Sequence, residues 1–326
     1  MATILNNNYA SLADLVKASN FDGNMKKLLG EMAMEDSFMA ACPWFETNDG
    51  MRHKNMKASK LGKGEFVAVN QGRGTTSSDF QLSEENICYY SVISKVDDSV
   101  LQAGTSEQAV KLRTSQDKLN LTGFMQDFQK QIFYSKMSSD SKSFNGLAER
   151  RSVKSSKYFH DGGKKTGGAT SMYLVQFGED GMNMKHQPGH VGFETKDRGM
   201  KSYERTINGS LRTVDMWEME YNIWSLLDLF DERCLIRYGN LDPIGATNGI
   251  DPEEIVRMKN QLPVMGKGAA AYVNRSLITQ AELVLLRKDN VMYTRDNIEN
   301  FGPVIKIMGV PMFLQDCISD KEEIVS

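Results

Sequence analysis

Apolar and polar residues alternate along LRTVDMWEMEYNIWSLLDLFDERCLIRYGNLD, a stretch that ends at Asp242. The residues that share one face are Trp217, Met219, Tyr221, Ile223, Ser225 and Leu227. A period of two is that of a β-strand, whose successive side chains point to opposite faces. We therefore expect a long strand followed by its continuation, paired with a second strand at Met172–Phe177. Such a sheet needs a partner on its apolar face.

A different period, of three to four residues, predicts a long helix before this sheet. Thr105 or Ser106 can cap the helix, and Glu107 puts an acid in its first turn. The apolar stripe consists of Leu121, Phe124, Met125, Phe128 and Ile132. Unbroken from Ser106 to Lys136, the helix would be about 46 Å long at about 1.5 Å per residue. A helix of this length beside long strands predicts an elongated subdomain.

The first 45 residues have the pattern of an arm. Apolar residues recur at helical spacing on either side of Asn20–Gly23, which predicts two short amphipathic helices. The apolar stripe needs a surface to lie on, either the core of the same subunit or a neighbour. Pro43 disfavours helix at Cys42, so the arm ends in the run that contains Trp44.

Residues 46–85 contain few large apolar groups and predict a long hairpin. Two β-like pieces, Arg52–Ala58 and Glu65–Asn70, flank a turn at Leu61–Gly64. Because a two-stranded hairpin alone is marginal in water, we expect it to lie on another subunit. Between Met51 and Gly74 there is one acid, Glu65, and the basic residues are Arg52, Lys54, Lys57, Lys60, Lys63 and Arg73. They indicate a solvated loop, a nucleic-acid patch or a loop that reaches an acidic neighbour.

Residues 243–320 predict a second compact unit, an α/β layer. A helix starts at Asp251, with Pro252 at its first position and acids in its first turn. Strands are expected at Ala269–Asn274 and Val304–Met308, with a helix at Thr279–Leu286 between them. The last residues, KEEIVS, are expected to be frayed.

Composition indicates a globular chain of two subdomains with extensions. The 326 residues are 40% hydrophobic and 25% charged, and the net charge is −3, which excludes a general DNA binder. No apolar run approaches the roughly 20 residues that span a bilayer, so we expect no membrane contact. The N-terminus also lacks an export signal. Four scattered cysteines, Cys42, Cys88, Cys234 and Cys317, fit reduced thiols better than disulfides or a zinc site.

Catalytic, cofactor and metal sites are not predicted. The run Gly163-Lys164-Lys165 does not complete the phosphate-loop pattern GxxxxGK[ST], so the basic segment 149–169 is read as a surface loop. His186 and His190 are separated by Pro188-Gly189 and have no third ligand in sight. One alternative of another class stays open: a soluble enzyme that uses Cys42 or Cys234 with His160.

Six motifs, taken in order, resemble a known family. They are NGLAERR after the long helix, GGATSMYLVQFGED, HQPGHVGFETKDRG, WEMEYNIWSLLDLFDERCLIRYGNLD, AAYVNRSL and GVPMFLQD. Their order over residues 40–318 resembles tailed-bacteriophage major capsid proteins with the Hong Kong 97-type shell fold. That α+β fold implies a wedge-shaped subunit with an arm, an extended loop, a peripheral domain with a spine helix, and an axial domain.

Mapped onto this chain, the resemblance implies five parts. They are an N-terminal arm at 1–45, an extended β-hairpin loop at 46–82, a peripheral domain at 83–242 with its spine helix at 106–136, an axial domain at 243–318, and a C-terminal tail at 319–326. Because the axial-like unit follows the peripheral strands instead of being inserted before them, we expect a permuted connectivity. The six basic residues of the loop, together with Trp44, are the candidate inter-subunit contacts.

The function that the resemblance implies is structural rather than enzymatic. Copies of the chain would assemble as pentamers and hexamers into an icosahedral head shell around double-stranded DNA, in the host cytoplasm, and end in the virion. Portal, scaffolding and decoration proteins would be partners, and DNA would be contacted weakly and without sequence preference. An encapsulin-like compartment shell is the alternative of the same fold.

Overall fold

The computed structural model describes residues 36–103, 105–190, 192–207, 210–245, 247–286, 292–298 and 302–326. The two helices expected around Asn20–Gly23 lie outside these residues. The described chain begins at Asp36, which caps the short helix α3 (Ser37–Ala41). The Asp36 carboxylate accepts hydrogen bonds from the backbone N–H groups of Phe38 and Met39. Phe38 lies in the centre of the main core, where it packs edge-on against three aromatic rings.

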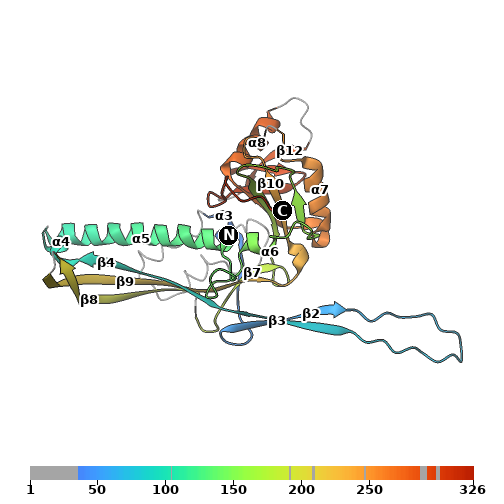
Figure 1. The fold of residues 1–326 in the computed structure, drawn as a ribbon, viewed down its shortest axis with the longest axis horizontal. Coiled ribbons are helices and arrows are strands. Elements are labelled where there is room, and N and C mark those ends of the chain that lie inside the picture. The colour runs from blue at the N-terminus through green and yellow to red at the C-terminus, as the bar shows by residue number, and fades with distance from the viewer. Residues whose placement is uncertain are drawn as a thin grey trace.

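The predicted spine helix is confirmed as α5 (Ser106–Tyr134), 29 residues long. Thr105 caps it in a capping box with Gln108, which satisfies two backbone N–H groups at the helix start. The predicted apolar stripe is buried, from Leu121 at 0% exposure to Ile132 at 1%. A short helix, α4 (Asp98–Gln102), leads into α5, which runs beside long strands in Figure 1.

These strands form a five-stranded sheet on one side of α5. Its members are β1 (Trp44–Glu46), β4 (Cys88–Asp97), β7 (Met182–His186), β8 (Phe193–Ile207) and β9 (Ser210–Leu229). β9 is the 20-residue strand that the alternation predicts, and it pairs antiparallel with β4, β7 and β8. Tyr221 and Ile223 belong to the same core as the α5 stripe. Glu218 and Glu220 occupy the alternate positions of β9 and therefore point to the other face of the sheet.

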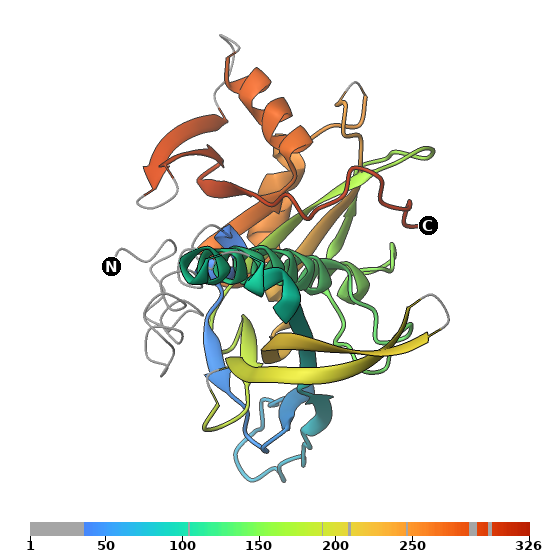
Figure 2. The same ribbon diagram turned by 90° about the vertical axis from the view of Figure 1, so that its left-hand side faces the viewer.

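A second, seven-stranded sheet lies on the other side of α5 (Figure 2). Its order is β12 (Tyr293–Ile298), β13 (Gly302–Ile307), β14 (Val310–Leu314), β11 (Ala269–Val273), β6 (Thr170–Gln176), β10 (Leu235–Leu241) and β5 (Phe159–Asp161). Alternate residues of β6 enter two different cores. Tyr173 joins the core shared with α5, while Met172 and Leu174 join a core covered by two helices. β6 therefore reads as a continuous apolar run, as expected for a strand buried on both faces.

The helices over that second core are α7 (Pro252–Gln261) and α8 (Arg275–Leu285). α7 starts where the sequence predicts, with Asp251 as its cap. α8 starts four residues before the predicted Thr279, because the Asn274 side chain accepts a hydrogen bond from the Leu277 N–H and caps it there. Short elements complete the chain: α6 (Leu147–Arg150), η1 (Glu232–Cys234) and η2 (Pro263–Gly266).

The single sheet expected over residues 170–242 is wrong. The Met172–Phe177 run does pair with the predicted continuation of the long strand, β10, and also with β11, but β9 pairs with none of these strands. Asp231 caps η1 between β9 and β10, and the strand that follows belongs to the other sheet. The permuted connectivity, in which the whole axial-like unit follows the peripheral strands, is also wrong. Two strands of the seven-stranded sheet, β5 and β6, precede β7–β9 in sequence, while β10–β14 of the same sheet follow them. The seven-stranded unit is thus assembled from both sides of the long strands.

The predicted hairpin exists, but its second strand was misplaced. β2 (Arg52–Lys60) pairs with β3 (Asp79–Asn86), not with Glu65–Asn70. Beyond Lys60 the two arms of the loop are joined by side chains instead of a ladder. The Thr76 hydroxyl accepts from the Lys63 N–H at 3.1 Å, and the tight turn lies at Ala68–Gln71. Figure 1 shows the hairpin extending away from the rest of the subunit.

The expectation of a frayed C-terminus is also wrong. Glu322 is 8% exposed, and its carboxylate lies 2.9 Å from the Arg237 guanidinium on β10. Tyr134, the last residue of α5, and Ser171 on β6 both donate hydroxyl hydrogen bonds to the same carboxylate. Backbone hydrogen bonds in both directions join Glu322 to Ala169. The tail is held because one acid satisfies donors from three elements.

Candidate assembly surfaces

The root of the hairpin is fixed to the five-stranded sheet by polar contacts. Asn55 donates a hydrogen bond to the Asp228 carboxylate at 2.6 Å, and the His53 imidazole lies 3.5 Å from the other oxygen. Arg150 binds Glu85 of β3 through two nitrogens, at 3.1 and 2.6 Å. Bidentate pairs of this kind fix orientation as well as distance. The hairpin therefore leaves the subunit in a defined direction.

The opposite face of the hairpin carries large apolar side chains that its own subunit leaves exposed. Met56 pairs across the ladder with Leu82, and the two side chains are 61% and 54% exposed. Phe80, two residues before Leu82 on the same face, is 64% exposed. We call these three residues the apolar hairpin face. A contiguous patch of this kind marks an interaction site, because water contact with it is unfavourable.

The tip of the loop, residues 61–78, adds further apolar groups. Phe66 extends fully into solvent, and Val69 is 94% exposed. Two of the predicted basic residues, Lys63 and Arg73, lie exposed on the same tip. The tip thus combines apolar and basic side chains at the point farthest from the subunit's own core (Figure 1).

The structure separates the predicted contact residues into three groups. Trp44 is 3% exposed within the main core, so its selection as a surface contact is wrong. Lys54 pairs with Asp49 at 2.6 Å, and Lys57 pairs with Glu232 at 3.0 Å, both within the subunit. The remaining candidates are on the surface: Arg52, Lys60, Lys63 and Arg73. Their role as contacts between subunits stays a prediction.

The apolar hairpin face was not predicted from the sequence, because only the charged residues of the hairpin were considered as contacts. A usable signal was present, since Phe80 and Leu82 are large apolar residues at alternate positions in an otherwise polar run. Alternation of this kind in a predicted strand indicates a face that must be covered. Only the pairing of β3 with β2 places Met56 beside them.

The groups considered for chemistry have ordinary structural surroundings. Burial raises the pKa of the Cys42 thiol well above its usual range and that of Cys234 to about 12, so both stay protonated at neutral pH. The His160 ring contacts Glu254 at 2.5 Å and Gln261 at 3.2 Å. Lys164 of the glycine-rich segment pairs with Asp242 at 2.8 Å. None of these groups is poised as a nucleophile.

A metal-ligand cluster and a membrane-spanning helix are both absent from the residues that the structure describes. These residues contain no group of three or more His, Cys, Asp or Glu side chains placed to hold a metal ion. Within the same residues, no helix is both long and apolar enough to cross a membrane.

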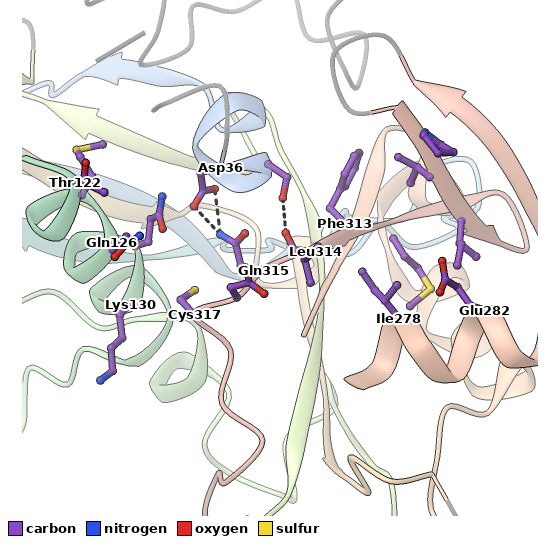
Figure 3. A pocket seen from close by; sticks show the side chains of 18 residues that line it. Asp36, Thr122, Gln126, Lys130, Ile278, Glu282, Phe313, Leu314, Gln315 and Cys317 are labelled. Atoms are coloured by element: carbon purple, nitrogen blue, oxygen red, sulfur yellow. Dashed lines mark hydrogen bonds between the residues drawn. The ribbon is translucent and has the colours of Figure 1, made fainter. Parts of the chain in front are cut away.

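A cavity of about 650 Å³ lies between α5 and the seven-stranded sheet. Figure 3 shows Asp36 at its side, where the Gln315 amide donates to both carboxylate oxygens, at 3.0 and 2.9 Å. Burial raises the pKa of Asp36, and these hydrogen bonds oppose that rise. The lining comes from α5, α8, β13, β14 and the segment after β14. The cavity therefore marks the joint between the spine helix and the seven-stranded unit.

Several solved structures are similar to this chain. A structure of bacteriophage Epsilon15 is similar, with a TM-score of 0.58, 16% identity and 97% of each chain covered. The bacteriophage JBD30 capsid gives a TM-score of 0.46 at 7% identity, covering 86% of this chain and 90% of that one. An encapsulin complex from Synechococcus elongatus gives a TM-score of 0.37 at 11% identity, covering 61% and 85%.

Sequence comparison gives the family directly. Among curated proteins, none matches the chain. Residues 20–326, however, match the sequence profile of the family described as major capsid protein GP7. This match covers nearly the whole chain, and the similarity to the bacteriophage Epsilon15 structure covers 97% of it. The chain therefore belongs to the major capsid protein GP7 family and has the shell fold of tailed-phage capsids.

Proposed function

We propose that this chain assembles with copies of itself, as pentamers and hexamers, into the icosahedral head shell that encloses the double-stranded DNA of a tailed phage. The observation that carries the proposal is the hairpin with its exposed apolar face, Met56, Phe80 and Leu82. A lone subunit leaves this face in water, and a neighbouring subunit can cover it. Interfaces that are each of modest affinity are enough to hold a shell together when every subunit makes several of them.

The two sheets supply the domains of the proposed shell subunit. The seven-stranded sheet with α7 and α8 is the axial domain, and α5 with the five-stranded sheet is the peripheral domain. Residues 46–82 form the extended loop, and residues 319–326 form a tail that packs at the joint. Portal, scaffolding and decoration proteins are the proposed partners, and contact with DNA is weak because the chain has a net charge of −3. The chain is proposed to act without enzymatic activity.

The test is to express the chain alone and examine it by size-exclusion chromatography and negative-stain electron microscopy over a range of concentrations and salts. Shells, tubes or five- and six-membered rings are the expected products. Co-expression with a scaffolding protein from the same genome belongs to the same test. A chain that stays monomeric under all of these conditions contradicts the proposal. Particles that package a cargo protein in place of DNA indicate an encapsulin-like compartment instead.

A matched pair of variants links assembly to the apolar hairpin face. Leu82→Asp places a charge on that face, while Gln81→Asp places the same charge on the adjacent exposed position of the other face. We expect Leu82→Asp to abolish particles and Gln81→Asp to preserve them. Equal assembly by the two variants would contradict the role of the apolar hairpin face in assembly.

A further inference from the structure

We propose that the C-terminal segment is a strap that fixes the angle between α5 and the seven-stranded sheet, and through that angle the diameter of the assembled particle. The C-terminal strap consists of residues 315–325, which follow β14 and include most of the tail. Its effect on particle diameter rests on the proposed function, because only a chain that forms shells has a particle diameter. The angle itself is a property of the single subunit.

Both ends of the C-terminal strap are bound to segments outside α5. At its start, the Gln315 side chain donates to the Asp36 carboxylate, and the Gln315 backbone N–H donates to the Val273 carbonyl on β11 at 2.8 Å. Near its end, the Val325 N–H donates to the Asn240 side chain at 2.9 Å, and that side chain donates back to the Val325 carbonyl at 3.0 Å. Asn240 lies on β10, so strands of the seven-stranded sheet hold the strap at both ends.

Between these two anchors, the C-terminal strap contacts the last residue of α5. The Ser319 N–H donates to the Tyr134 hydroxyl at 2.9 Å, and this hydroxyl donates in turn to the Glu322 carboxylate. The preceding residue of α5, Phe133, packs edge-on against Tyr173 of β6, with 5.4 Å between the ring centroids. The end of α5 is therefore held by the strap and by β6 together.

The Glu322 carboxylate relates the end of α5 to two strands at once. It accepts hydrogen bonds from Tyr134 on α5, from Ser171 on β6 and from Arg237 on β10. Hydrogen bonds weaken steeply outside a narrow range of distance and angle. All three donors are therefore satisfied at one position of the α5 end relative to these strands. A carboxylate held in this way defines an angle as well as a contact.

The middle of α5 is bound differently on its two sides. On the side of the five-stranded sheet, Asp117 accepts a hydrogen bond from Ser94 of β4 at 3.1 Å, and Asp127 accepts one from Tyr90. On the side of the seven-stranded sheet lies the cavity of about 650 Å³, which separates α5 from α8 and β14 (Figure 3). Because side chains do not fill this space, it opposes a rotation of α5 less than a packed core would.

The length of α5 amplifies a rotation at its strapped end. Its 29 residues span about 43 Å at about 1.5 Å per residue. A rotation of about 10° about Tyr134 thus displaces the far end by about 7 Å. The five-stranded sheet follows α5 because both belong to one core, and its long strands extend away from the seven-stranded sheet (Figure 1). A shell of one diameter needs one subunit shape, so a loose strap predicts particles of several diameters.

The first test measures the angle in the unassembled, full-length subunit. Azide-bearing amino acids at Lys111 on α5 and Leu283 on α8 are coupled to spin labels, which leaves the native cysteines unmodified. Both side chains are exposed, and neither belongs to the strap. Double electron–electron resonance then gives the distribution of distances between the two labels. We expect a single narrow distribution when the strap is intact, and a broad one overturns the inference.

A matched pair of variants separates the strap from general loss of a tyrosine hydroxyl. Tyr134→Phe removes the hydroxyl that meets the strap, while Tyr90→Phe removes one that donates to Asp127 on the side of the five-stranded sheet. We expect Tyr134→Phe to broaden the distribution or to shift its centre by about 3–6 Å, the displacement at Lys111 for a rotation of about 5–10°. Tyr90→Phe should leave it unchanged.

A second strap variant keeps this test decisive if Tyr134→Phe does not fold. Glu322→Gln keeps the size of the side chain and removes its charge, and it should broaden the distribution in the same way. Far-ultraviolet circular dichroism shows which variants are folded. Wild-type distances in folded Tyr134→Phe or in folded Glu322→Gln overturn the inference.

The second test measures particle diameters by negative-stain electron microscopy. We expect particles of one diameter from the wild type and from Tyr90→Phe, and several diameters or tubes from Tyr134→Phe. Particles of only the wild-type diameter from Tyr134→Phe overturn the link between the strap and shell size. Absence of any wild-type particle contradicts the proposed function instead. The label distances decide the role of the strap in either case, so the two failures are distinct.

Discussion

The buried carboxylate of Glu322 gives the sharpest test of how the C-terminal tail contributes to stability. It joins the end of α5, through Tyr134, to β6 through Ser171 and to β10 through Arg237. The ion-pair side chains are only 6% and 5% exposed. Replacing Glu322 with alanine leaves the Arg237 charge buried without its carboxylate. The guanidinium keeps two backbone carbonyl partners, both at 3.2 Å.

Removal of one partner of a buried ion pair costs about 3–5 kcal/mol. We therefore expect Glu322→Ala to lower the free energy of unfolding by that amount. Glu323→Ala, at the next and exposed position, should change it by about 0.5 kcal/mol or less. At a urea dependence of about 3 kcal/mol per molar, the unfolding midpoint of Glu322→Ala falls by about 1–1.7 M. The assay is urea denaturation of dilute, unassembled subunits, followed by tryptophan fluorescence and far-ultraviolet circular dichroism.

A second variant checks the reasoning about the unpaired charge. Combining Glu322→Leu with Arg237→Met removes both charges, so part of the lost stability should return relative to Glu322→Ala. The reasoning is refuted if Glu322→Ala and Glu323→Ala unfold within about 1 kcal/mol of each other. In that case the tail would be bound by its backbone contacts with Ala169 and not by the carboxylate.

Three further predictions follow from other elements. Phe128→Ala on the buried stripe of α5 should lower the free energy of unfolding, measured by urea denaturation, by about 3–5 kcal/mol. Leu119→Ala, 71% exposed on the same helix, should lower it by about 0.5 kcal/mol or less. Equal losses would contradict the packing of α5. Thr105→Ala should cost about 0.5–2 kcal/mol, because it removes the capping box of α5, and Thr105→Ser should retain most of that stability. Burial, with the positive charge of Lys185 in addition, lowers the pKa of His53, so the unfolded chain binds the proton more tightly and stability falls as the pH drops below about 6.5. The protection factors of the β2 and β3 amides, which correct for the pH dependence of intrinsic exchange, should therefore fall on acidification in the wild type and fall less in His53→Asn. An unchanged pH dependence of these factors in the variant would refute this role for His53.

The elements themselves were largely predictable from local pattern. The apolar stripe from Leu121 to Ile132 gave the buried face of α5, and the alternation around Tyr221 gave β9, because both signals lie within one segment. The helix start at Asp251 was readable for the same reason, since a cap acts on its own first turn. The capsid family was also within reach of the sequence, because its motifs appear in order along the chain.

The candidate surfaces were less predictable, because exposure depends on contacts between distant segments. Trp44, in the run that ends the arm, and Lys57, in the basic stretch after it, were both predicted as contacts between subunits. The fold buries Trp44 in the main core and pairs Lys57 with Glu232, far along the chain. The apolar hairpin face is defined only when β2 and β3 are in register.

Sequence alone thus determined most of the helices and strands, with β3 as an exception, since period, caps and turns are local properties of the chain. Only the tertiary structure decided which strands pair. The alternation in β9 and the continuous apolar run of β6 indicate that each strand is buried, yet neither pattern specifies the partner strand, and the two strands belong to different sheets. The same limit explains the tail, where Glu322 is held by donors that lie 85 to 188 residues away in sequence. The contacts of a residue depend on the packing of the whole chain, and the short-range pattern of the sequence does not specify them.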